Sequence, residues 1–186
     1  MQKLIYLSLG AFLVTAGFSP AFAAGESSKS TTAPAPKTAL KCKTGEVVKK
    51  VKIQGVMKDS CVKVKAGILP DEDLYQQGRQ LAKDGQYEWA LQVLATIQNQ
   101  NDPRVLNYTG YSNRKAGRID VGITYYKKAL AINPNFVLAR EYLGEGYVAA
   151  GRIDLAMVEL NEIKTRAGVQ SEEYKDLLEA ITSAKS

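Results

Sequence analysis

From Asp71 to the end of the chain, apolar residues recur every three or four positions, which is the spacing of amphipathic helices. Within this region one frame occurs three times: a glycine, a second glycine seven residues later, and a small residue five residues after that. The frames start 32 and 34 residues apart and are Gly78-Gly85-Ala90, Gly110-Gly117-Gly122 and Gly144-Gly151-Ala156. A period of this length predicts stacked helix pairs, because one pair cannot bury its apolar face alone.

The glycine frame also predicts where each helix ends. The second glycine of a frame is expected directly after the first helix, in the left-handed conformation that glycine adopts most easily. The first glycine lies inside that helix, where it costs about 1 kcal/mol relative to alanine. Close approach of the second helix would offset this cost. We therefore predict repeats over residues 71–102, 103–136 and 137–170, and a capping helix over 171–186.

Residues 41–66 have a different pattern. Valines and lysines alternate in Val48–Ile53 and again in Val62–Lys65, and this period of two predicts two short β-strands. Gly55 and Asp59-Ser60 lie between them and are interpreted as the turn region of a small hairpin.

The first 40 residues predict export. Lys3 precedes an apolar run from Leu4 to Gly17, and Ala21-Phe22-Ala23 is typical of a signal-peptidase site. Residues 1–23 are therefore predicted to be a signal peptide, and residues 24–40, rich in Ser, Thr, Ala and Pro, a flexible linker. No later segment is apolar enough to cross a bilayer, so the mature protein is expected to lie in the periplasm or to be secreted.

Export indicates a role for the two cysteines. In an oxidising compartment Cys42 and Cys61 are most simply a disulfide, which on the chain-entropy model contributes about 3 kcal/mol. A structural zinc site is the alternative, but it needs four ligands and the chain has no His. The close spacing of a redox-active cysteine pair is also absent.

The helical frame resembles the tetratricopeptide repeat (TPR). The third unit carries the match most fully, with Leu143-Gly144, Tyr147, Ala156 and Leu160 at the family's spacing, and Pro134 closes the second unit. The resemblance implies an all-α solenoid of three helix pairs and a capping helix. It implies binding and assembly, with no cofactor, metal or catalytic residue. The chain departs from the family where the early Trp is replaced, at Leu74, Leu106 and Arg140.

In TPR proteins the first helix of each pair lines a concave groove. Transferred by position, this geometry implies a partner-binding groove that is basic and aromatic in its middle and acidic toward its C-terminal end. Its residues are Tyr75, Arg79, Lys83, Arg104, Asn107, Tyr111, Arg114, Glu141, Glu145 and Val148. Tyr and Arg are enriched at binding hot spots, although these positions also fit an ordinary solvated helix face. The basic residues that some relatives use to grip a terminal carboxylate are missing at Leu138 and Tyr142.

The formal net charge of +6 is concentrated in one segment. Residues 37–66 hold nine lysines against Glu46 and Asp59. An alternative function is therefore docking on anionic lipid or polysaccharide of the cell envelope. The same lysines fit equally well a second interpretation, in which they protect an exposed strand edge from aggregation. The segment has no aromatic residue to stack on bases, which argues against nucleic acid. The lysines proposed for the anionic contact are Lys49, Lys50, Lys52, Lys63 and Lys65.

The composition argues against an enzyme. There is no His to act as a base or ligand, and no glycine-rich phosphate loop or serine-nucleophile elbow. Glu141 and Glu145 lie one helical turn apart on one side of a helix, so they do not flank a substrate as a glycosidase pair does. The sequence thus predicts an exported module that binds another protein or a peptide segment.

Overall fold

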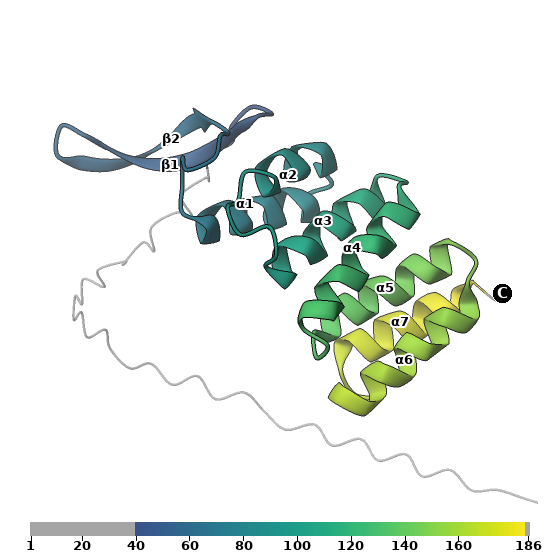
Figure 1. Cartoon of the computed structure of the whole chain (residues 1–186). Helices are drawn as coiled ribbons and strands as arrows, with labels where there is room; N and C mark the ends of the chain where they lie inside the picture. The colour runs from purple at the N-terminus through teal and green to yellow at the C-terminus, as the bar shows by residue number, and fades with distance from the viewer. Residues whose placement is uncertain (1–39, 185–186) are drawn as a thin grey trace, which may run out of the picture. The chain divides into compact units, whose positions relative to one another are not determined.

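The computed structural model describes residues 40–184, so the predicted signal peptide and almost all of the predicted linker lie outside the described residues. A two-stranded hairpin comes first, followed by seven helices (Figure 1). This confirms the predicted fold class. The elements are β1 (Glu46–Ile53), β2 (Val56–Lys63), α1 (Asp71–Lys83), α2 (Tyr87–Leu94), α3 (Pro103–Lys115), α4 (Ile119–Ile132), α5 (Val137–Ala149), α6 (Ile153–Ala167) and α7 (Glu172–Ser183).

The hairpin is antiparallel, and its second strand begins earlier than the sequence predicted. Gln54 and Gly55 have φ angles of 49° and 82°, so the chain reverses in two residues and Ile53 pairs directly with Val56. The interpretation of Asp59-Ser60 as turn residues was wrong, because both lie inside β2. Asp59 stands opposite Lys50, and their side chains form an ion pair of 3.5 Å that suits a strand position.

The predicted disulfide is present. Cys42 and Cys61 are bonded, with their Cα atoms 5.5 Å apart, a separation ordinary for disulfides. The bond fixes the segment before β1 to the middle of β2.

The base of the hairpin packs on the first helix pair. Val47 is 2% exposed and joins the core that contains Leu74 and Val93. The Gln77 side chain accepts a hydrogen bond from the Val48 N–H at 2.8 Å and donates one to the Val48 carbonyl at 2.9 Å. The Trp89 indole N–H donates to the Glu46 carbonyl at 3.1 Å. The hairpin therefore covers the end of the helical stack that α1 and α2 form.

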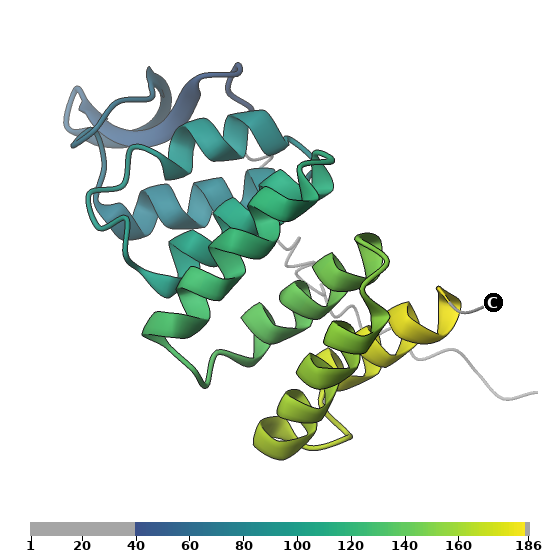
Figure 2. The same ribbon diagram turned by 45° about the vertical axis from the view of Figure 1, so that its right-hand side comes forward.

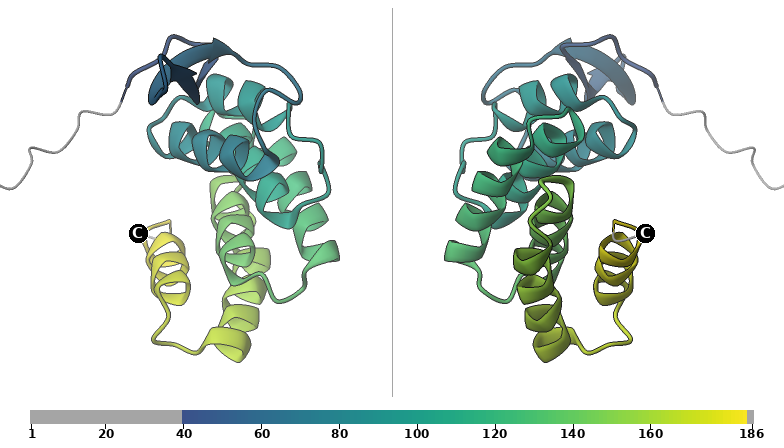
Figure 3. Two further views of the ribbon diagram at one scale, coloured as in Figure 1. Left: turned by 90° about the vertical axis from the view of Figure 1, so that its left-hand side faces the viewer. Right: turned by 90° about the vertical axis from the view of Figure 1, so that its right-hand side faces the viewer.

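The helices form two layers. The first helices of the pairs, α1, α3 and α5, lie side by side with α7, and the second helices α2, α4 and α6 lie behind them (Figure 2). At the opposite end from the hairpin, α7 packs against α5 and α6 and buries Leu177 and Ile181 (Figure 3). Ser171 caps α7 by accepting a hydrogen bond from the Tyr174 N–H. No helix within residues 40–184 is long and apolar enough to cross a membrane.

The glycines behave as predicted in the first two repeats. Each glycine after a first helix has a positive φ, of 77°, 87° and 72° at Gly85, Gly117 and Gly151. Inside α3, a Cβ atom on Gly110 would lie 2.7 Å from the Tyr126 ring and 3.1 Å from the Gly122 carbonyl oxygen. Such distances leave no room for a side chain, so α4 can approach α3 only because both positions are glycine.

The third repeat departs from this prediction. A Cβ atom on Gly144 would collide with the side chain of Leu177 in α7, and no atom of α6 is among its nearest neighbours. The reason is that α5 faces two helices, and α7 supplies the leucine that fills the space beside Gly144.

The repeated tetrapeptide Gly-Arg-Ile-Asp connects neighbouring repeats. Arg118 forms an ion pair with Glu88 at 2.7 Å, and Arg152 forms the equivalent pair with Asp120 at 2.9 Å. Both pairs are largely exposed, so each contributes about 0–1 kcal/mol.

Candidate partner-binding face

A cluster of six tyrosines connects the helices of the first two repeats with α5. The closest pair is Tyr111 and Tyr142, with ring centroids 5.1 Å apart. Tyr108 and Tyr126 are buried, whereas Tyr111 and Tyr142 are half-buried and reach the surface. Burial raises the pKa of the Tyr126 and Tyr142 hydroxyls, so both stay neutral at physiological pH. We call the set the tyrosine cluster: Tyr75, Tyr87, Tyr108, Tyr111, Tyr126 and Tyr142.

Four of these six tyrosines were not among the predicted groove residues: Tyr87, Tyr108, Tyr126 and Tyr142. Tyr108 and Tyr142 occupy equivalent positions in two repeats, 34 residues apart, and their rings lie 6.5 Å apart edge to face. That spacing is the signal by which the sequence could have revealed them. Tyr111 and Tyr142 bring the cluster to the surface of the layer formed by α1, α3 and α5, which we call the α1–α3–α5 face.

The basic residues of α1 and α3 surround the N-terminal part of the cluster. The Arg79 Nε–H donates to the Tyr108 hydroxyl at 3.0 Å, and among the described residues Arg79 has no acidic partner. The Arg104 guanidinium lies 4.6 Å from the centroid of the Tyr75 ring and pairs with two carboxylates. Lys83 is exposed at the end of α1. Of these cations, Arg79 and Lys83 are therefore the ones available to an acidic partner.

Arg114 holds the cluster together. Its side chain is 7% exposed, its Nε–H donates to the Tyr126 hydroxyl at 3.2 Å, and it forms an ion pair with Glu145 of α5. The guanidinium also lies 5.8 Å from the centroids of Tyr111 and Tyr142. The predicted site residues Tyr111, Arg114 and Glu145 thus meet in space, and Arg114 supports the structure of the face.

Asn107 lies beneath this face and not on it. The residue is completely buried, and within residues 40–184 neither its side-chain oxygen nor its side-chain nitrogen has a hydrogen-bond partner. The Ser112 hydroxyl on the same helix is buried without a partner as well. Asn107 therefore has no solvent contact in this conformation, whereas Glu141, at the equivalent position of the next repeat, keeps 6% of its surface exposed.

Glu141 is the acidic counterpart at the other end of the face. The residue is 6% exposed, and within residues 40–184 its carboxyl forms neither a hydrogen bond nor an ion pair. Burial, with further contributions from neighbouring acids, raises its pKa to about 8. Those acids are Glu145, Asp176, Glu173 and Glu172, the last three from α7.

Replacing Glu141 with Gln should stabilise the protein in a pH-dependent way. Well below pH 4.5 the carboxyl is protonated in both the folded and the unfolded chain, so the raised pKa of Glu141 has no effect on stability there. As the pH rises toward 8, the unfolded chain ionises first and wild-type stability falls. We therefore expect Glu141→Gln to be only about 1 kcal/mol more stable than wild type at pH 5 and about 3–5 kcal/mol more stable at pH 9, measured by urea unfolding. Glu179→Gln, an exposed change on α7, should show no such difference.

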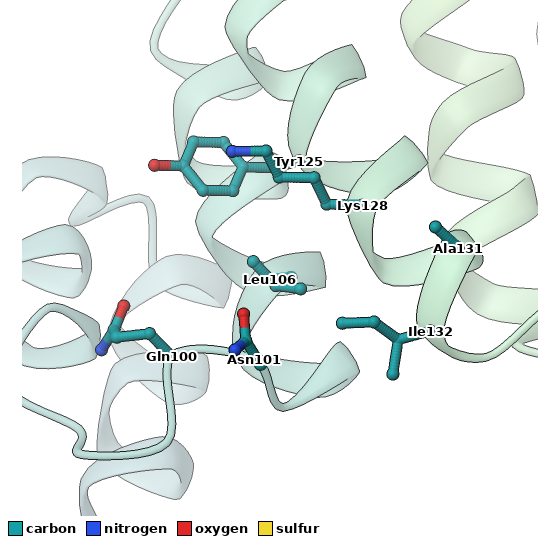
Figure 4. A pocket seen from close by; sticks show the side chains of 7 residues that line it. All are labelled: Gln100, Asn101, Leu106, Tyr125, Lys128, Ala131 and Ile132. Carbon is teal, nitrogen blue, oxygen red and sulfur yellow. The ribbon is translucent and has the colours of Figure 1, made fainter.

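Two surface depressions lie away from this face. The larger, of about 450 Å³, is formed by α4, Leu106 of α3 and the loop before α3; Figure 4 shows the side chains that line it, among them Leu106, Tyr125 and Ile132. The smaller, of about 240 Å³, lies where α2 meets the loop before β1. Neither includes a predicted groove residue. In the described part of the chain no three His, Cys, Asp or Glu side chains are grouped as metal ligands would be.

A family model of the tetratricopeptide repeat matches residues 114–181. The helices within these residues match the tetratricopeptide repeat. The match begins at the last two residues of α3 and continues through α4, α5, α6 and most of α7, so the sequence signature lies in the second half of the second repeat, the third repeat and the helix after it. No curated protein matches the chain.

Solved TPR structures resemble the chain at low sequence identity. The first TPR domain of Spaghetti (RPAP3), bound to an HSP90 peptide, is 15% identical with a TM-score of 0.55, over 66% of this chain and 98% of that one. The Yersinia enterocolitica secretion chaperone SycD, in complex with a YopD peptide, is 20% identical with a TM-score of 0.53, over 63% and 92%. The TPR2B domain of yeast Sti1, in an Hsp70 complex, is 17% identical with a TM-score of 0.56, over 62% and 95%. These identities show the shared fold alone.

Proposed function

We propose that this protein is an exported protein-interaction module that holds a segment of another protein against the α1–α3–α5 face. The observation that carries the proposal is the combination on that face of half-buried Tyr111 and Tyr142 with Arg79, which has no acidic partner in the described part of the chain. Tyr and Arg are the residue types most enriched at binding hot spots. The three solved relatives named above were determined with a peptide or Hsp partner, which supports the same kind of role here.

Site-specific photocrosslinking in the native cell tests this proposal. A photoreactive amino acid at Lys83 is expected to capture a partner protein, because Lys83 is exposed on the proposed binding face. The same group at Val121, 44% exposed on α4 in the other layer, serves as the control. Capture should drop at least about tenfold when Arg79→Ala and Tyr111→Ser are combined. Equal capture from both positions, or capture unaffected by the double change, would contradict the binding face.

Export is part of the proposal. It is supported by the N-terminal sequence pattern and by the Cys42–Cys61 disulfide, since disulfides persist in oxidising compartments. Fractionation of cells that express the chain with a C-terminal tag should place a form lacking about 23 residues outside the cytoplasm. A chain that keeps its full length in the cytoplasm would refute export.

A second candidate function is docking of the hairpin on an anionic envelope surface. The specific observation is an apolar tip: Ile53, Val56 and Met57 are 45%, 59% and 58% exposed. The tip extends about 20 Å along the strand from buried Val47 and points away from the helices in Figure 1. Lys50, Lys52, Lys63 and Lys65 are exposed and Lys49 is half-buried. Apolar side chains next to lysines favour an anionic lipid bilayer over a polysaccharide.

Vesicle sedimentation tests the second candidate. The protein should sediment with vesicles that contain phosphatidylglycerol and not with pure phosphatidylcholine vesicles. Replacing Ile53 and Val56 with Ser should reduce the bound fraction several-fold, although every lysine remains, because the inserted apolar area is lost. Val121→Ser, which removes an exposed valine from α4, is the matched control. Vesicle binding that depends on the lysines but is unchanged when Ile53 and Val56 are replaced would exclude insertion of the apolar tip.

A further inference from the structure

We propose that Glu141 is the recognition site for a Lys or Arg side chain of the bound partner segment. The inference rests on the proposed function, since it assigns the chemistry of a partner that lies on the α1–α3–α5 face. It predicts that this partner is basic at the position that meets α5.

The first argument is the missing partner of Glu141. Buried carboxyl groups in proteins are normally hydrogen-bonded or paired with a cation, because an isolated buried charge is costly. Glu141 is 6% exposed and has neither kind of partner among the described residues. The cation nearest along the face, Arg114, is already bonded to Glu145 and to the Tyr126 hydroxyl.

The second argument is the sign of the surrounding charge. Glu145 extends from the next turn of α5, and Glu172, Glu173 and Asp176 come from α7. All four of these acids raise the pKa of the Glu141 carboxyl. These charges favour the protonated form of Glu141, and an arriving ammonium or guanidinium group would favour the ionised form instead.

The third argument is the surface beside the carboxyl. Tyr142 follows Glu141 in α5, is half-buried and belongs to the tyrosine cluster. The aliphatic stem of Lys or the plane of an Arg guanidinium packs well on an aromatic ring while its charged end reaches a carboxylate. A small inorganic cation gains nothing from such a ring. The combination therefore favours a basic side chain as the occupant.

The charged side chains at the two ends of the α1–α3–α5 face also differ in sign. Arg79, without an acidic partner, lies on α1, and Glu141, without a basic partner, lies on α5. A segment that places an acidic residue toward α1 and a basic residue toward α5 would match both. Such a segment of mixed charge matches the face better than an all-acidic one, which the acids near α7 would repel.

Selection from a random peptide library displayed on phage tests the inference with the immobilised full-length chain. Wild type is expected to enrich peptides with Lys or Arg at one fixed position. Glu141→Gln should lose that fixed position and bind synthetic wild-type-selected peptides at least about tenfold more weakly. Glu179→Gln, which removes an exposed carboxylate from α7, should select the same peptides as wild type.

A proton count distinguishes direct contact from a structural effect of the substitution. Since the pKa of free Glu141 is about 8, binding a basic side chain at pH 7 should ionise the carboxyl and release close to one proton. Calorimetry in two buffers of different ionisation enthalpy measures this release, which should vanish in Glu141→Gln. Enriched peptides without a basic position, or a preference for a basic residue that persists in Glu141→Gln, would overturn this inference and leave the proposed function intact. If no enriched peptide depends on Arg79 and Tyr111, the proposed function fails with it.

Discussion

Replacing Gly110 with Leu is expected to abolish the cooperative folding of the repeats. Even a single Cβ at this position would lie 2.7 Å from the Tyr126 ring and 3.1 Å from the Gly122 backbone oxygen, and Tyr126 is completely buried. The helices α3 and α4 would have to separate, and the tyrosine cluster would separate with them. We expect a loss of more than about 3 kcal/mol, seen as a missing or strongly lowered thermal transition by circular dichroism.

Two further substitutions give this prediction its controls. Gly110→Ala should lose less stability than Gly110→Leu but still unfold at lower temperature, because the clash begins at Cβ. Ala149→Leu adds the same bulk at an exposed position of α5 and should change stability by less than about 0.5 kcal/mol. A Gly110→Leu protein with a wild-type melting temperature would refute the close-packing account of the glycine frame.

Replacing Arg114 with Ala is expected to destabilise the protein by about 3–5 kcal/mol. The change leaves the Glu145 carboxylate without its cation, next to Glu141, and removes the hydrogen bond to the Tyr126 hydroxyl. Urea unfolding at neutral pH measures the loss.

A double substitution separates the buried charge from the packing around it. Arg114→Met combined with Glu145→Met should recover most of the lost stability, because replacing both members of a buried ion pair by apolar side chains is often neutral. Arg152→Ala removes an exposed arginine from the pair with Asp120 and should cost less than about 1 kcal/mol. If Arg114→Ala costs no more than Arg152→Ala, the supporting role of Arg114 is wrong.

The Arg114 prediction changes how the binding face should be probed. The sequence placed Arg114 and Tyr111 together at the centre of the predicted groove, and the two side chains do lie close together, with the Arg114 guanidinium 5.8 Å from the centroid of the Tyr111 ring. Because Arg114 is buried, its substitution would report on folding before it reports on binding. Lys83 and Arg79 are the residues at which binding can be tested with the scaffold intact.

The sequence by itself determined the helical repeats, the ends of their first helices, the capping helix and the disulfide. These features follow from local rules: apolar periodicity, the left-handed glycines Gly85, Gly117 and Gly151, and the capping serine Ser171. The beginning of β2 was missed because Asp59-Ser60 resembles a turn, whereas Gln54-Gly55 reverses the chain within two residues.

Only the tertiary structure decided which residues meet between elements. The docking of the hairpin through Gln77 and Trp89, the contact of Gly144 with Leu177 and the burial of Asn107 each depend on helices far apart in the sequence. The same is true of Glu141. Its position shows an acid one turn from another acid, but the loss of its solvent and the approach of the α7 carboxylates arise only when α5 is packed. Desolvation and proximity are properties of the assembled layers, and for that reason no local pattern reveals them.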